Sequence, residues 1–88
     1  MEPGLVAGLF PNPVRGRAQL SFRLEQRSRV SCIVYDAAGK RAAVLLDGTR
    51  EPGDHVLSWD ASRLSPGVYF CALEAGAASR SVRFVVAR

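Results

Sequence analysis

The sequence predicts an all-β domain: a seven-stranded, immunoglobulin-like antiparallel β-sandwich. Three observations lead to this prediction. Short runs alternate between apolar and polar residues, turn residues separate the runs every ~8–12 positions, and no segment sustains a helical period. Eighty-eight residues suffice for one hydrophobic core, so we expect residues 1–88 to form a single domain. Residues 1–9 are expected to be an N-terminal arm or edge strand.

The first half of the chain is expected to supply four strands. A proline-rich corner, Pro11-Asn12-Pro13, ends the first of them because two prolines remove two backbone donors, and 14–17 continues as a loop. Asp36 and Gly39 indicate a hairpin turn after the third strand, and Asp47-Gly48 indicates another turn after the fourth. The strands are expected at 4–10, 18–24, 29–35 and 41–46, with Leu20, Phe22, Leu24, Val30, Cys32 and Val34 facing inward.

The second half supplies three more strands around the single tryptophan. His55 and Trp59 share one face of the fifth strand. The Pro66-Gly67 turn follows, because proline presets φ and glycine tolerates positive φ. We expect the segments on either side of this turn to fold back on each other and bring Trp59 and Tyr69 to a shared core. These strands are expected at 55–59, 68–74 and 81–87.

The charge distribution indicates a solvated surface. The net charge is +4, and eleven of the twelve basic residues are arginines, scattered among apolar positions as on the wet face of strands. We therefore expect no nucleic-acid partner. No apolar run approaches the roughly 20 residues that span a bilayer, so no membrane insertion is expected. The first ten residues lack a basic start and a long apolar stretch, so any export signal is expected elsewhere.

The two cysteines, Cys32 and Cys71, both lie in strand-like runs. An even count permits one disulfide, which would indicate an oxidising compartment. The alternative is two separate buried thiols that act as small apolar residues. The sequence leaves both interpretations open, because two core strands can hold the pair near or far apart. Neither cysteine has a neighbour with the spacing of a zinc or redox motif.

The sequence predicts no enzyme, no metal site and no cofactor. It lacks the nucleophile-elbow, phosphate-loop and dinucleotide-binding motifs. The single histidine, His55, lies among apolar neighbours and is expected to be structural. Each aspartate lies at a predicted turn, where its side chain is expected to bond local backbone rather than a cation. These aspartates are Asp36, Asp47, Asp54 and Asp60.

Four ordered motifs and the chain's last strand suggest a family. The motifs are Phe10-Pro11-Asn12-Pro13, the series 34–40 (VYDAAGK), Gly53-Asp54-His55 leading to Trp59-Asp60, and Leu64 followed by 67–70 (GVYF). In this order they resemble the C-terminal sorting domain of type IX secretion substrates. They are also similar to the immunoglobulin-like domain of the flagellar hook-capping protein. The basic, apolar ending at 83–88 fits the same family. The matching residues that we expect to build the fold are Pro11, Asn12, Pro13, Tyr35, Asp36, Gly39, Gly53, His55, Trp59, Asp60, Gly67 and Tyr69.

The resemblance implies a non-catalytic sorting domain that an outer-membrane secretion system recognises. It implies a protein partner in the secretion machinery, and a secreted or cell-surface location in a Gram-negative bacterium, reached via the periplasm. The alternative function is a structural or adhesive module that self-associates through its edge strands. A terminal strand with free backbone groups suits strand addition by a partner. The candidate recognition strand consists of Val82, Arg83, Phe84, Val85, Val86, Ala87 and Arg88.

Overall fold

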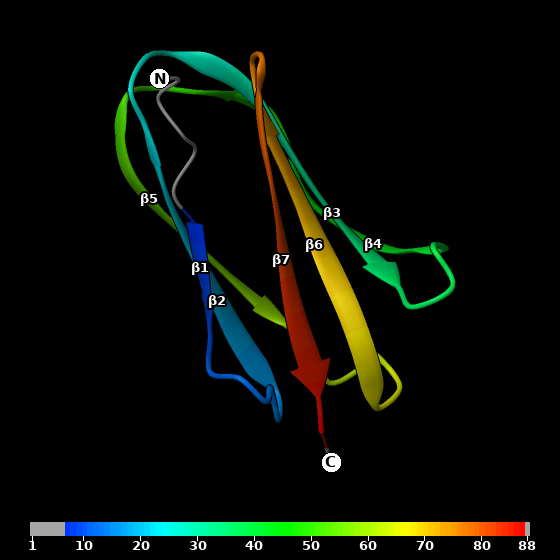
Figure 1. Cartoon of the computed structure of the whole chain (residues 1–88). Coiled ribbons are helices and arrows are strands. Elements are labelled where there is room, and N and C mark those ends of the chain that lie inside the picture. Colours follow the sequence, from blue (N-terminus) through cyan, green and yellow to red (C-terminus); the bar gives the residue numbers. More distant parts are fainter. Residues whose placement is uncertain (1–6, 88) are drawn as a thin grey trace.

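The computed structural model describes residues 7–87, which form seven antiparallel strands in two sheets (Figure 1). The strands are β1 (Ala7–Phe10), β2 (Arg17–Leu24), β3 (Ser28–Asp36), β4 (Arg41–Arg50), β5 (Gly53–Asp60), β6 (Gly67–Ala75) and β7 (Ala78–Val86). The predicted all-β sandwich is confirmed. The expected first strand at 4–10 falls partly outside the described residues, and its described part is β1.

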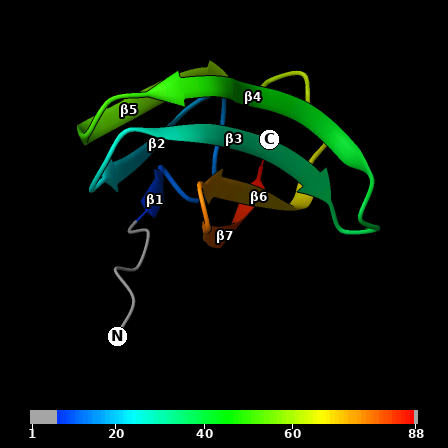
Figure 2. The same ribbon diagram turned by 90° about the horizontal axis from the view of Figure 1, so that it is seen from above.

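Two sheets pack face to face, one with the order β1-β2-β5 and the other with the order β4-β3-β6-β7 (Figure 2). The segments on either side of the Pro66-Gly67 turn do not pair with each other, because β5 and β6 belong to different sheets. The connection between them crosses from one layer to the other. Local turn chemistry predicts that the chain reverses there, but it does not specify which strand each segment pairs with. Trp59 and Tyr69 nevertheless reach the same core, from opposite sheets.

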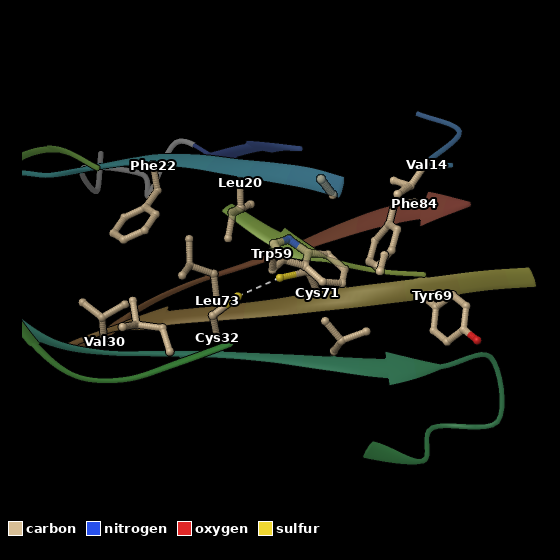
Figure 3. Close-up of a cluster of buried hydrophobic side chains, with 14 of the residues drawn as sticks. Val14, Leu20, Phe22, Val30, Cys32, Trp59, Tyr69, Cys71, Leu73 and Phe84 are labelled. Atoms are coloured by element: carbon tan, nitrogen blue, oxygen red, sulfur yellow. Dashed lines mark hydrogen bonds between the residues drawn. The ribbon is translucent and has the colours of Figure 1, made fainter. Parts of the chain in front are cut away.

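Alternating side chains build the core as the sequence predicts. Leu20, Phe22 and Leu24 of β2 are buried in the same core as the inward residues of β3. At one end of the sandwich, the rings of Trp59 and Tyr69 cluster on Phe84, which is fully buried (Figure 3). Trp59 meets the Phe84 ring edge-on at 5.7 Å between centroids, and Tyr69 stacks on it at 5.8 Å. Such pairs add to the hydrophobic gain from burial. The two sheets are therefore joined here through one phenylalanine.

The predicted turn at Asp47-Gly48 is wrong. Both residues continue β4, and they pair with Ser31 and Val30 of β3. Two irregularities of register let the longer β4 follow β3, and Asp47 forms a 2.9 Å ion pair with Arg29. The ladder of hydrogen bonds to a neighbouring strand outweighs the local turn preference of the aspartate-glycine pair.

The turn aspartates divide into two groups. Asp36 accepts hydrogen bonds from the backbone N–H groups of Ala38 and Lys40, and Asp60 accepts one from Ser62, as expected. For Asp47 and Asp54 the expectation is wrong, because each pairs with an arginine on a neighbouring strand. The scattered arginines do lie on the wet surface, as predicted: all of them within 7–87 are exposed. Arg88 lies outside the described residues.

Candidate recognition edge at the last strand

The proline-rich corner is bonded to the last strand. The side-chain oxygen of Asn12 accepts a 3.1 Å hydrogen bond from the Val85 N–H. The Val14 N–H donates to the Val85 carbonyl at 2.7 Å, and the Ala87 N–H donates to the Val14 carbonyl at 2.8 Å. These three bonds occupy the outer edge of β7 over its C-terminal half. The corner and the candidate recognition strand are thus one structural unit.

Residues 14–16 lie in the connection between β1 and β2, as predicted, whereas Arg17 already belongs to β2. Within this connection Val14 forms an isolated parallel bridge with Val86. Its side chain is fully buried and points into the core near Phe84 (Figure 3). The peptide bonds before Pro11 and Pro13 are both cis, and these two prolines and Asn12 are exposed. The predicted loop therefore contains an additional core residue. An isolated valine between a proline and an arginine carries no period-two pattern, so the sequence offers no signal for it.

The candidate recognition strand presents only some of its side chains. Phe84 and Val86 are buried in the core, so the folded domain cannot offer them to a partner. Val82, Val85 and Ala87 are half-buried, and Arg83 is exposed. Arg88 lies outside the described part of the chain. Deleting this strand would therefore remove core residues together with any recognition surface.

The N-terminal half of β7 keeps an open edge. Backbone groups in an antiparallel ladder point alternately toward and away from the partner strand. Because the N–H and carbonyl of Val85 point away from β6, those of Ser79, Ser81 and Arg83 point the same way. Within residues 7–87 these groups have no hydrogen-bond partner. We refer to residues 79–83 as the open edge.

The outer face of the four-stranded sheet carries exposed apolar side chains next to this edge. One row crosses all four strands, with Arg41 opposite Tyr35, Tyr35 opposite Phe70, and Phe70 opposite Arg83. Phe70 is 36% exposed. A second row places Val44, which is 52% exposed, beside Ile33. We call the surface of Tyr35, Phe70, Ile33 and Val44, with its flanking arginines, the outer apolar face. The sequence did not reveal it, because the strand order decides which residues become neighbours.

The remaining motif residues have structural positions. His55 stacks on Phe22 at 5.2 Å between ring centroids, and its Nε2–H donates to the Glu51 carbonyl at 2.7 Å. The Tyr69 hydroxyl donates to the Ser65 carbonyl at 2.6 Å and ties β6 to the preceding turn. The motif glycines Gly39, Gly53 and Gly67 all have positive φ. No group of three His, Cys, Asp or Glu side chains comes together within 7–87, and no helix there could cross a membrane.

The cysteines are neighbours inside the core. Cys32 and Cys71 are both fully buried, and their Sγ atoms lie 2.8 Å apart as a thiol pair (Figure 3). The hydrogen bond with Cys71, together with burial, raises the pKa of the Cys32 thiol. Of the two arrangements that the sequence left open, the near one is present.

Comparison with known protein families matches residues 8–87 to the secretion system C-terminal sorting domain. The chain belongs to this family. No curated protein and no solved structure matches the chain. The match confirms the resemblance to the sorting domain of type IX secretion substrates and favours sorting over the structural module. As a sorting domain, the chain interacts with proteins of the secretion machinery and marks its protein as secreted or displayed at the cell surface. The family is not catalytic.

Proposed function

We propose that the secretion machinery recognises this sorting domain by adding a strand along the open edge of β7. The supporting observation is the row of unpaired backbone groups at Ser79, Ser81 and Arg83 on an exposed edge. In strand addition, main-chain hydrogen bonds supply affinity and alternate side chains supply specificity. The opposite edge of that sheet, β4, carries no residue of the predicted recognition strand.

The outer apolar face is proposed to supply the specificity. Phe70 and Arg83 are cross-strand neighbours, so a strand added to β7 would pass directly beside them. An aromatic ring next to an arginine suits a partner segment with apolar and acidic side chains. The Pro11–Pro13 corner is proposed to keep the C-terminal half of the β7 edge closed. The added strand can then pair only with residues 79–83, and this limits the registers in which it can bind.

The test is a secretion assay on point variants, since deleting residues 82–88 would remove Phe84 and unfold the core. The chain is fused behind a signal peptide and a reporter in a bacterium with type IX secretion. The key variant is Ser81→Pro. It removes an N–H that points outward and no bond to β6, so the fold should survive. We expect a loss of surface delivery of about two- to tenfold, since one partner hydrogen bond is lost at a cost of ~0.5–1.5 kcal/mol.

The matched controls separate recognition from stability. Ser81→Ala keeps the N–H and should be delivered normally. Phe70→Ser should reduce delivery, whereas Val56→Ser, at a more exposed position (64%) on the other sheet, should not. Circular dichroism and Tm of each purified variant verify folding. Normal delivery of a folded Ser81→Pro variant would rule out the open edge as the recognition site.

We further propose that the protein crosses the periplasm of a Gram-negative bacterium before the outer-membrane step, and that the chain, as a single domain, has no enzymatic activity of its own. Family membership supports both proposals. Cell fractionation after blocking outer-membrane export should place the fusion in the periplasm. Accumulation in the cytoplasm would contradict the route.

Self-association is a second use of the same exposed backbone groups, because an open strand edge pairs with any compatible strand. It is measured by size-exclusion chromatography with light scattering across a wide concentration range. Wild type should show dimers at high concentration, and Ser81→Pro should reduce them. A strict monomer throughout would exclude self-association.

A further inference from the structure

We propose that Cys32 and Cys71 are a disulfide site, and that the bond forms between the two central strands of the four-stranded sheet when the chain folds in an oxidising compartment. This inference does not depend on how the secretion machinery recognises β7. It rests on the positions of the two thiols and on the connectivity of the strands that carry them.

The register puts both thiols on one face of the sheet. Cys32 of β3 lies opposite Leu73 of β6, and Cys71 lies opposite Val34, so the cysteines are diagonal neighbours. Both are fully buried, and both side chains point into the space between the sheets (Figure 3). From a separation of 2.8 Å, forming the bond requires the sulfur atoms to approach by about 0.8 Å more.

The connectivity explains what the bond would secure. The cysteines are 39 positions apart, and the chain between them forms β4 at the sheet edge and then crosses to the other sheet as β5. The contact between β3 and β6 is thus non-local, and the unfolded chain has to close a long loop to make it. A cross-link that closes a long loop restricts the unfolded state most. Small exported domains with limited cores use disulfides in this way.

The chemistry is a thiol–disulfide exchange with an oxidant that is itself a disulfide, either a small molecule or a thiol oxidoreductase. One cysteine loses its proton and attacks the oxidant, forming a mixed disulfide and releasing one thiol. The second cysteine then attacks the sulfur of the first and releases the second thiol. The cysteines lose two electrons and two protons, and one oxidant disulfide becomes two thiols. Because both sulfur atoms are buried, the exchange takes place before the core closes.

The first measurement counts free thiols. The reduced, unfolded chain is refolded with oxidised and reduced glutathione, then unfolded in guanidinium with iodoacetamide and weighed by mass spectrometry. We expect no added label, and two labels when the sample is reduced first. Cys71→Ala, which retains one cysteine, should take one label after reduction and calibrates the readout. Two labels on the unreduced protein, a glutathione adduct, or a disulfide-linked dimer would each overturn the proposal.

The second measurement tests whether the bond secures the fold. The Tm of the oxidised chain should fall by roughly 10–20 °C when reductant is added, as expected for a bond closing a loop of this length in a small domain. The double variant Cys32→Ala/Cys71→Ala should have a Tm that does not respond to reductant. Equal Tm values for the oxidised and reduced wild-type chains would overturn the proposed stabilising role.

Discussion

The side chain of Asn12 holds the backbone of Val85, 73 positions further along the chain. The bond joins the corner after β1, in one sheet, to β7, the edge strand of the other. Val14 extends the contact with two backbone bonds. The proline-rich corner and the candidate recognition strand are therefore in contact. The corner occupies the outer edge of β7 over the C-terminal half of that strand.

Replacing Asn12 by alanine should loosen this corner. The variant loses one hydrogen bond at an exposed position, so we expect a loss of about 1 kcal/mol in the free energy of unfolding. Hydrogen exchange at the Val85 amide should become faster, while amides of β3 keep their protection. Asn12→Asp retains an acceptor oxygen and is the matched control. Unchanged exchange at Val85 in Asn12→Ala would show that Val14 alone holds the strand.

Removing the Tyr69 hydroxyl should destabilise the domain without disturbing its core. Tyr69→Phe loses the hydrogen bond to the Ser65 carbonyl but keeps the stacking on Phe84. We expect a cost of about 1–2 kcal/mol, measured by urea denaturation, because the carbonyl also loses its donor. Tyr35→Phe is the control, since this half-buried tyrosine makes no side-chain hydrogen bond within 7–87. Equal costs for the two variants would mean that the Ser65 bond contributes nothing.

Local sequence patterns predict the strands well. Period-two alternation in 18–24 and 29–35 identifies the inward residues of β2 and β3, because each buries one face only. Asp36 and Gly39 identify a tight turn, since one bonds backbone two positions on and the other takes positive φ. These signals succeed because the physical cause lies within a few residues.

Features that depend on distant residues are not predictable in this way. The assignment of β5 and β6 to different sheets depends on which partner each strand finds, and both carry similar alternation. Asp47-Gly48 has turn chemistry but remains extended because β3 supplies bonds across the ladder. The open edge at 79–83 and the outer apolar face follow from strand order as well. Most of the candidate site therefore becomes visible only with the fold.

Truncating Phe84 should nearly unfold the domain. Phe84→Ala removes a fully buried ring that contacts Trp59 and Tyr69, and such changes cost about 3–5 kcal/mol. That is a large share of the roughly 5–15 kcal/mol that stabilises a small domain. Phe70→Ala, at a 36% exposed position on the outer apolar face, should cost much less. Thermal and urea unfolding compare the two, and a larger effect at Phe70 would contradict the observed core.

Asp60 should make stability depend on pH in the acid range. The Ser62 backbone N–H, with a further contribution from the Ser62 side chain, holds the pKa of this carboxyl below its ordinary value of 3.8 in the folded state. The unfolded chain therefore takes up the proton at a higher pH than the folded one. The stabilisation is complete above the ordinary pKa, and it is lost as the pH falls through the lower, folded pKa. Asp60→Asn cannot gain this contribution.

The measurement is the Tm of wild type and Asp60→Asn between pH 7 and about pH 2, a range that begins well above the ordinary pKa of the carboxyl. Wild type should be the more stable at neutral pH, and the difference should shrink below the ordinary pKa of the carboxyl. The other carboxylates titrate in both proteins, so only the difference between the curves reports on Asp60. A difference that stays constant down to the lowest pH would show that the Ser62 bond does not depend on the charge.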